Sequence, residues 1–347
     1  MYIKRILLIV VLMGLVGAGI FSYYIYNTIF SPNTDFSQNE VVIYVPSDAT
    51  YKDVRNQLKE VLNDIESFDI VAQKKGYVSY LKPGKYAIQK GMNNNEIVNS
   101  LRSGNIPVQV SFNNQETIER LAGRISEQIE ADSISLLNAM KDEAFIESND
   151  FSMNTRLAMY IPNTYEFYWN TSAETFRERM LKEYTTFWNE IRLQKASSLN
   201  LTPLEVIVLA SIVQKETAKV DERPKVAGVY LNRLKAGMLL QADPTVIYAI
   251  KKKTGDFDTI IKRVLFKDLE TDSPYNTYKY SGLPPGPITM PDISSIEAVL
   301  NYETHDYYYF VADVSRPGYH LFAKNLAQHN RNRQQYINWI NRQGINR

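Results

Sequence analysis

The stretch from Leu209 to Tyr248, LASIVQKETAKVDERPKVAGVYLNRLKAGMLLQADPTVIY, decides the central part of the fold. It follows the segment Thr202–Glu205 (TPLE), a capping box with proline at the first helical position, so a helix is predicted to begin there. The body of this helix, Val206–Val213, is apolar on nearly all sides, which is typical of a buried helix. Glu216 lies at the end of the helix, on a face that is apolar one and two turns earlier.

Glu216 is the candidate catalytic residue of this chain. A carboxyl group held partly out of water has its charged form disfavoured, so its pKa rises and it can carry a proton at neutral pH. Such a group can deliver that proton to a leaving oxygen. The alternative interpretation is a solvated last helical turn, Gln214–Lys219, in which Glu216 has no chemical role.

Two polar segments downstream favour the catalytic interpretation. Gln241–Tyr248 (QADPTVIY) offers an amide, a carboxylate, a hydroxyl and a phenol, and Ser273–Ile288 (SPYNTYKYSGLPPGPI) is a loop rich in proline, glycine and tyrosine. Most of these groups are uncharged hydrogen-bonding groups, which suit a neutral polyhydroxyl ligand better than a phosphate. The sequence contains no Gly-rich phosphate loop, no H-E-x-x-H motif and no G-x-S-x-G motif.

The N-terminus is predicted to be a membrane anchor. Residues 6–26, ILLIVVLMGLVGAGIFSYYIY, form a run of 21 uncharged residues, and a spanning helix needs roughly 20. Lys4 and Arg5 precede the run and the next basic residue is Lys52, which predicts a cytoplasmic N-terminus and a chain that continues outside the cytoplasm. A cleaved signal peptide is the alternative, but Gly17–Gly19 lies inside the apolar run and makes a poor cleavage site.

Composition limits the remaining possibilities. A chain of 347 residues suggests two or three domains, and its formal net charge of +1 provides no strong field that would attract nucleic acid. The absence of cysteine excludes disulfides, thiol nucleophiles and cysteine-based metal sites. The spacing of His305, His320 and His329 matches no zinc motif, so we expect these histidines to be structural.

Alternating strand and helix signals between residues 41 and 112 predict a small α+β module. The predicted strands are 41–45, 86–88 and 108–112, and the predicted helices are 51–62 and 93–101. Either a spacer or a polysaccharide-binding domain of LysM type agrees with this pattern.

Three further segments carry a local signal. Glu116–Met153 is amphipathic and is predicted to be helical, and Tyr307–Asp313 (YYYFVAD) is predicted to be a strand. Arg156–Trp169 (RLAMYIPNTYEFYW) is dense in aromatic residues. Its rings suit either the stacking of sugar faces or plain packing, and packing is the favoured interpretation.

Several motifs together resemble the YceG-like family, also called the MltG family, of endolytic murein transglycosylases. In chain order they are LKPGKYAI, NEIVNSLRSG, IPNTYEF, SIVQKET, VYLNRL, QADPTVIY, YNTY, GLPPGPI and YYYFVAD followed by GYH. The resemblance implies an α+β fold with a single-pass transmembrane helix, a small LysM-like module and a larger mixed α/β catalytic domain. The expected divisions are a cytoplasmic N-terminus at 1–5, the transmembrane helix at 6–26, a linker at 27–40, the LysM-like module at 41–112 and the catalytic domain at 113–347.

The resemblance also implies an activity. The family cleaves the bond between N-acetylmuramic acid and N-acetylglucosamine within peptidoglycan strands, at the outer face of the cytoplasmic membrane, and leaves 1,6-anhydro ends that limit strand length. Glu216 matches its catalytic glutamate in S-I-V-x-K-E-T. The expected substrate-binding residues are Gln241, Asp243, Thr245, Asn276, Thr277 and Tyr278. No metal or organic cofactor is implied, and the implied partners are peptidoglycan, the cytoplasmic membrane and glycan-polymerising synthases, without nucleic acid.

The chain departs from the family pattern at a few positions, and two other functions stay open. Gln214 stands where the family often has an acidic residue, Asn163 where it has aspartate, and Asn114-Gln115 where Glu-Gly is usual. A hydrolase of the same bond would use Glu216 as its acid and Asp243 as its base. A non-enzymatic scaffold would instead hold the synthases near glycan through the LysM-like module.

Overall fold

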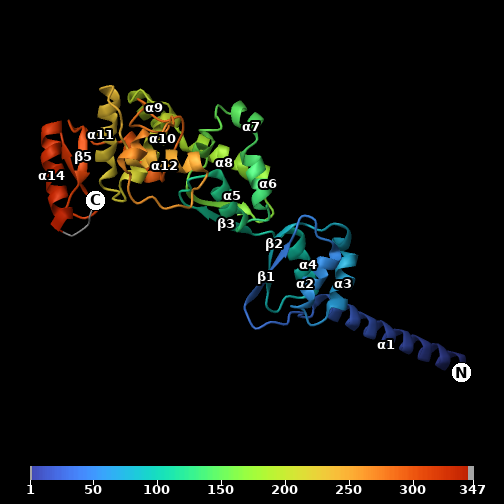
Figure 1. Ribbon diagram of the computed structural model, residues 1–347. Helices are drawn as coiled ribbons and strands as arrows, with labels where there is room; N and C mark the ends of the chain where they lie inside the picture. Colours follow the sequence, from blue (N-terminus) through green and yellow to red (C-terminus); the bar gives the residue numbers. More distant parts are fainter. Residues whose placement is uncertain (1, 343–347) are drawn as a thin grey trace. The chain divides into compact units, whose positions relative to one another are not determined.

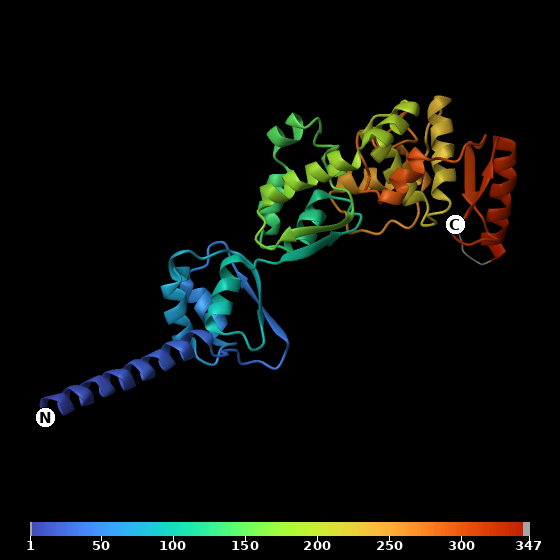
Figure 2. The same ribbon diagram turned by 180° about the vertical axis from the view of Figure 1, so that it is seen from behind.

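The computed structural model describes residues 2–342 and divides into two compact units (Figures 1 and 2). The first unit comprises the chain up to residue 110 together with residues 128–131 and 165–172. The second comprises residues 111–127, 132–164 and the chain from residue 173 onward. Within the described residues, helices are combined with three two-stranded sheets, so the fold class is mixed α+β, as the sequence predicted.

The N-terminal helix α1 (Tyr2–Phe30) is apolar and its side chains are exposed along nearly its whole length. Among the described residues it is the single unbroken helix that is long and apolar enough to cross a membrane. The helices Glu190–Ser198 and Pro203–Glu216 are long and apolar enough to cross a membrane only if they are counted as one span, and they are bent by 77° relative to each other. Because α1 continues past Tyr26 to Phe30, the first residues of the expected linker 27–40 are helical.

A buried cluster of amide side chains joins the end of α1 to the rest of the first unit. Asn94 Nδ2 donates hydrogen bonds to the backbone oxygen of Thr28 at 2.8 Å and to Ser67 Oγ at 2.9 Å. Asn33 Nδ2 donates to Asn94 Oδ1 and to the backbone oxygen of Asp64, both at 2.7 Å. Because buried amides need partners, this cluster holds the residues after α1 in one arrangement on the module.

The first unit is built on an antiparallel pair of strands, β1 (Glu40–Val45) and β2 (Gly84–Gln89), in which Glu40 lies opposite Gln89. The unit also contains α2 (Tyr51–Lys59), α3 (Ile65–Lys74), the 3-10 helix η1 (Tyr77–Ser79) and α4 (Asn94–Ser103). Their apolar faces form one buried core. The predicted strands and helices of this module are confirmed, because strand alternation and the capping box at Asn93 are local signals.

The segment Glu116–Met153, predicted to be helical and amphipathic, forms three short helices. They are α5 (Ile118–Ser126), α6 (Ser133–Met140) and α7 (Glu143–Ser148). Asp132 and Asp142 separate these helices, because each side chain caps the helix that follows it. Asp132 Oδ1 accepts a hydrogen bond from the backbone nitrogen of Ser135 at 2.7 Å, and Asp142 Oδ1 accepts one from that of Phe145 at 3.3 Å. Strand β3 (Pro107–Phe112) precedes these helices and pairs with β4 (Asn163–Tyr168).

Helix α10 (Pro203–Glu216) lies at the centre of the second unit. Thr202 caps it with proline at the first position, as predicted, and every residue from Val206 to Val213 is buried. The helix contacts α9 (Glu190–Ser198), α11 (Arg223–Lys235), α12 (Asp243–Thr254) and α13 (Ile293–Leu300). The unit also contains α8 (Ala173–Phe187) and the 3-10 helices η2 (Arg156–Met159) and η3 (Phe266–Glu270).

The C-terminal part of the second unit is a hairpin covered by a helix. Strand β5 (Tyr309–Ala312) pairs antiparallel with β6 (His320–Ala323), and Ala312 lies opposite His320. Helix α14 (Leu326–Arg342) packs on this hairpin, as Figures 1 and 2 both show at the red end of the chain. β5 confirms the strand predicted within Tyr307–Asp313 and carries two aromatic side chains toward α11.

We expect Asn94→Ala to lower the free energy of unfolding of the first unit by about 1–3 kcal/mol, because it leaves buried partners of Asn94 unsatisfied. Asn99→Ala is the matched control, since Asn99 lies on the same helix but is exposed. Urea unfolding of the full chain in detergent, followed by hydrogen exchange in α3 and α4, measures the effect. Equal stability of the two variants would contradict a structural role for the amide cluster.

Candidate active site

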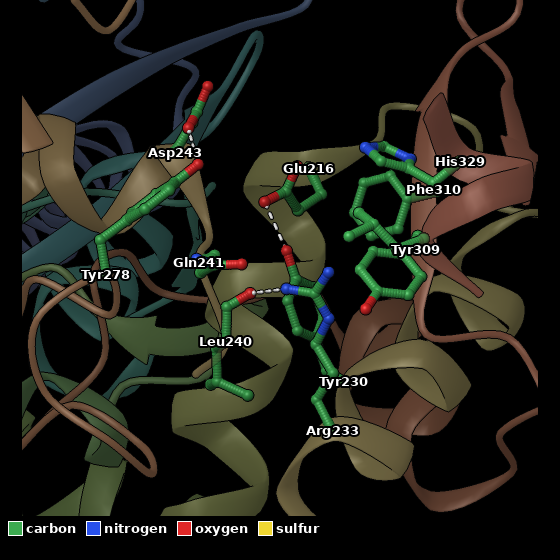
Figure 3. A pocket seen from close by; sticks show the side chains of 11 residues that line it. Glu216, Tyr230, Arg233, Leu240, Gln241, Asp243, Tyr278, Tyr309, Phe310 and His329 are labelled. Atoms are coloured by element: carbon green, nitrogen blue, oxygen red, sulfur yellow. Dashed lines mark hydrogen bonds between the residues drawn. The ribbon is translucent and has the colours of Figure 1, made fainter. Parts of the chain in front are cut away.

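A cavity of about 310 Å³ opens at the C-terminal end of α10 (Figure 3). Its walls come from α10, α11, the segment before α12, the loop after η3, β5 and α14. The lining residues are Glu216, Tyr230, Arg233, Leu240, Gln241, Asp243, Tyr278, Tyr309, Phe310, Leu326 and His329. The cavity is therefore assembled from segments that are far apart in the sequence.

Glu216 is the last residue of α10 and its carboxyl group faces the cavity. Tyr230 Oη, from α11, donates a hydrogen bond to Glu216 Oε1 at 2.6 Å. The pKa of the Glu216 carboxyl is raised from 4.5 to about 7, because burial and the charge of Asp243 raise it more than the hydrogen bond from Tyr230 and the charge of Arg233 lower it. Glu216 can therefore hold or release a proton near neutral pH.

Arg233 lies one helical turn after Tyr230 on α11, so both side chains reach the same face. The Arg233 guanidinium donates to the backbone oxygens of Tyr308 at 2.6 Å and Leu240 at 2.7 Å. These bonds tie the start of β5 and the segment before α12 to α11. The arginine therefore holds two walls of the cavity in place.

Asp243 and Tyr278 form one wall of the cavity, on one side of Glu216 in Figure 3. Tyr278 Oη donates to Asp243 Oδ1 at 2.6 Å. Burial, followed by the bond to Asp243, raises the pKa of Tyr278 far above its ordinary value, so the phenol stays protonated. Gln241 also lines the cavity, and its backbone adopts a positive φ of 49°. Three of the six predicted binding residues are thus brought together with Glu216.

The other three predicted binding residues, Thr245, Asn276 and Thr277, do not line this cavity. Their side chains are at most 1% exposed. Thr277 Oγ1 lies 2.8 Å from Thr245 Oγ1 and accepts a bond from the backbone nitrogen of Ala242 at 3.0 Å. Asn276 Oδ1 accepts from the backbone nitrogen of Tyr278 at 3.0 Å. Because their polar groups bind within the fold, they position the cavity wall instead.

An aromatic wall, which the sequence analysis did not predict, lies opposite Asp243 and Tyr278 in Figure 3. It consists of Tyr309 and Phe310 from β5 and His329 from α14. Phe310 meets the Tyr230 ring edge-on with centroids 6.0 Å apart, and Tyr309 stacks on His329 at 5.3 Å. The signal available in the sequence was the run of four consecutive aromatic residues that begins YYYFVAD, but it does not reveal which of them meet Glu216.

The three histidines do not share one role. His305 Nε2 lies 2.9 Å from the backbone oxygen of Lys225, and His320 Nδ1 lies 2.8 Å from Glu222 Oε2, so both are bound within the fold as expected. His329 instead lines the cavity. Burial lowers the pKa of His329, and the charges of Arg233 and Arg333 lower it further. Both effects favour the neutral form of its imidazole.

Glu222 supports the end of α10 from behind the cavity. Its buried carboxylate accepts bonds from Thr217 Oγ1 at 3.1 Å and from the backbone nitrogen of His320 at 2.7 Å. Thr217 follows Glu216 directly and ends the helix. Through these two hydrogen bonds, Glu222 attaches the backbone next to Glu216 to strand β6.

Two positions singled out in the sequence serve other parts of the second unit. Gln214 Nε2 donates to Asp292 Oδ2 at 2.9 Å, and Ser295 Oγ donates to Gln214 Oε1 at 2.5 Å, which fixes α10 to the start of α13. In the aromatic segment, Tyr160 is buried. Packing, the favoured interpretation of that segment, is confirmed for this ring. Across residues 2–342, no cluster of His, Asp and Glu side chains is arranged to hold a metal ion.

Comparison with known proteins identifies relatives along most of the chain. The family model described as "YceG-like family" matches residues 43–335. An endolytic murein transglycosylase from Bacillus subtilis (strain 168) is 33% identical over 333 residues, covering 89% of this chain and 88% of that protein. The protein of the same name from Streptococcus pneumoniae is 30% identical and covers 87% of this chain, which spans 59% of the length of that relative. A crystal structure of a YceG-like protein from Listeria monocytogenes superposes with a TM-score of 0.57 at 29% identity, covering 85% of this chain and 99% of that one.

Two substitutions should move the pKa of Glu216 in opposite directions. Tyr230→Phe removes a hydrogen bond to the carboxylate and should raise that pKa above about 7, whereas Asp243→Asn removes a nearby negative charge and should lower it. Carbon-13 NMR of labelled glutamate side chains across a pH titration measures both shifts.

Tyr280→Phe is the control for this titration, because Tyr280 Oη binds Asp272 outside the cavity at 2.8 Å. It should leave the pKa of Glu216 unchanged. Shifts of the same sign in Tyr230→Phe and Asp243→Asn would contradict the electrostatic account of this site.

Proposed function

The chain belongs to the YceG-like family, and we propose that it is an endolytic lytic transglycosylase, a lyase that cleaves peptidoglycan glycan strands. The observation that carries this proposal is a single carboxyl group, that of Glu216, with a pKa near 7 at the end of a buried helix and inside a polar cavity. A proton donor of this kind suits the cleavage of a glycosidic bond at neutral pH.

The proposed reaction needs one carboxyl group. Protonated Glu216 donates its proton to the oxygen that links N-acetylmuramic acid to N-acetylglucosamine, and this bond breaks as an oxocarbenium-like sugar develops. The resulting carboxylate then takes the proton of the muramic 6-hydroxyl, whose oxygen bonds to its own anomeric carbon. The products are a strand with a 1,6-anhydro end and a strand with a free 4-hydroxyl, and Glu216 is again protonated.

The hydrogen bond from Tyr230 supports both halves of this cycle. It fixes the orientation of the Glu216 carboxyl group through Oε1 and stabilises the carboxylate formed after the first proton transfer. The negative charge of Asp243 on the same cavity favours the positive charge that develops on the sugar. Asp243 is itself held by Tyr278 at 2.6 Å, so its direction is fixed before the sugar binds.

The walls of the cavity suit a neutral sugar. Gln241 provides an uncharged amide for hydroxyl and acetamido groups, and Tyr309 and Phe310 provide flat apolar surface for a sugar face. The guanidinium of Arg233 binds backbone oxygens rather than facing a ligand as a free charge. A phosphate ligand has less support here than a polyhydroxyl ligand.

We further propose a location and partners for the chain. Helix α1 is a single-pass anchor in the cytoplasmic membrane with its N-terminus in the cytoplasm, an orientation supported by Lys4 and Arg5. The catalytic domain then acts outside the cytoplasm on nascent strands, beside glycan-polymerising synthases, and limits strand length. The module at 41–112 is proposed to be LysM-like.

A hydrolase of the same bond is the second candidate, and the position of Asp243 favours it. Asp243 lines the same cavity as Glu216, so it could serve as the base that activates water. The two functions differ in their product, because hydrolysis leaves a reducing end that is one water heavier than the anhydro end. A non-enzymatic scaffold, by contrast, would keep its cellular effect when Glu216 is replaced.

Glu216→Gln should lower the rate of strand cleavage by about 10²–10⁴-fold, because the amide cannot donate the required proton. Mass spectrometry of products from uncrosslinked glycan strands and the full chain in detergent measures this. Glu205→Gln is the matched control, since it makes the same substitution in an exposed capping box of the same helix. Unchanged cleavage by Glu216→Gln would refute the assigned acid.

Asp243→Asn should still yield 1,6-anhydro ends, at a rate reduced by no more than about 10²-fold, because the sugar supplies its own nucleophile. The same mass spectrometry, run on wild type and variant, identifies the strand ends. Reducing ends made by the wild type and lost in Asp243→Asn would establish the hydrolase instead.

A further inference from the structure

A second cavity adjoins the one that contains Glu216. It has a volume of about 630 Å³ and shares Asp243 and Tyr278 with the first cavity, so the hydrogen-bonded pair of these two residues forms a common wall. Its other walls come from the loop between α12 and η3, from η3 itself and from α14. A ligand bound at Glu216 therefore has room to extend past this wall.

The chemistry of this second cavity differs from that of the first. Arg263 and Arg333 line it, both are exposed, and within residues 2–342 neither forms an ion pair or hydrogen bond with another side chain. Leu265 and Phe266 line it as well, and Phe266 is 86% exposed. A large aromatic side chain that is this exposed does not stabilise the core. The cavity thus combines two available guanidinium groups with apolar surface.

This combination points to a ligand that is both anionic and apolar. Guanidinium groups bind carboxylates through paired, charge-assisted hydrogen bonds, and exposed apolar side chains favour contact with methyl and methylene groups. A neutral sugar offers no charge for the arginines. A short acidic peptide with alanine-like side chains offers both features.

We propose that this second cavity binds the stem peptide carried by the muramic acid residue next to the cleaved bond. The inference rests on the proposed function, because that function places a muramic acid beside Glu216 and the lactyl ether of this sugar carries the peptide. Asp243 lies on the wall that both cavities share and repels peptide carboxylates on either side, but the second cavity also has Arg263 and Arg333, whose two positive charges exceed that single negative charge. The enzyme would therefore prefer strands that carry peptides over bare strands.

The test compares uncrosslinked strands of equal length whose muramic acids carry either an acidic stem peptide, the same peptide with amidated carboxylates, or a free lactyl carboxylate. The full chain in detergent should cleave the acidic-peptide strand about tenfold or more faster than the other two, as kcat/KM. In the double variant Arg263→Ala/Arg333→Ala this ratio should fall to near one. Raising the salt concentration should also lower the ratio, since both arginines are exposed.

Lys262→Ala is the matched control, because Lys262 is an exposed cation beside Arg263 that does not line the second cavity. It should keep the preference of the wild type. Equal rates on all three strands in the wild type would overturn the inference. So would an arginine variant that slows all three strands equally, because the arginines would then contact the sugar backbone or the lactyl carboxylate.

A binding measurement separates this inference from the proposed function. Fluorescence anisotropy of labelled strands with the Glu216→Gln full chain needs no cleavage. Tighter binding of the acidic-peptide strand, lost on adding Arg263→Ala/Arg333→Ala, supports the peptide site even if the wild type cleaves no strand. Cleavage of strands by the wild type without any such preference in binding would leave the proposed function intact and overturn the peptide site.

Discussion

The burial of one carboxyl group is the constraint on which the site depends. The rise of the Glu216 pKa from 4.5 to about 7 corresponds to a change of about 3 kcal/mol in the free-energy difference between its protonated and ionised forms. The folded chain binds this proton more tightly than the unfolded chain does, so this group's contribution to stability falls as pH rises from about 4.5 to 7. At neutral pH the raised pKa of Glu216 therefore lowers the stability of the fold, and the burial of the apolar residues Val206–Val213 offsets this cost.

Most polar groups around Glu216 serve to keep that environment in place. Arg233 would hold Glu216 ionised if its charge faced the carboxylate directly, but its hydrogen bonds go to backbone oxygens of Tyr308 and Leu240. Desolvation therefore outweighs its attraction, and the pKa rises. Glu222 fixes Thr217 and β6 in the same manner, on the far side of the helix end. These hydrogen bonds join the segments that form and support the cavity to one another.

The sequence predicted those features that depend on local signals. The capping box before α10 and the β-branched and aromatic run of β1 are such signals, and the acidic residue at the end of an apolar helix identified Glu216. The burial of Thr277 could not be predicted, because a polar residue in QADPTVIY or YNTY has the same sequence signal whether its side chain faces the cavity or binds the backbone inside the fold. His329 lines the cavity because α14 packs against β5. Such contacts depend on packing between distant segments.

The two adjoining cavities divide the charges of a substrate between them. In the first cavity the arginine is occupied by backbone oxygens, which leaves neutral hydrogen-bonding groups, aromatic faces and a negative aspartate. That environment stabilises a positive sugar and disfavours an anion. The second cavity presents two guanidinium groups that no carboxylate among residues 2–342 neutralises. A substrate with an uncharged backbone and acidic branches meets both environments at once, and the Asp243–Tyr278 wall sets where the backbone ends and a branch begins.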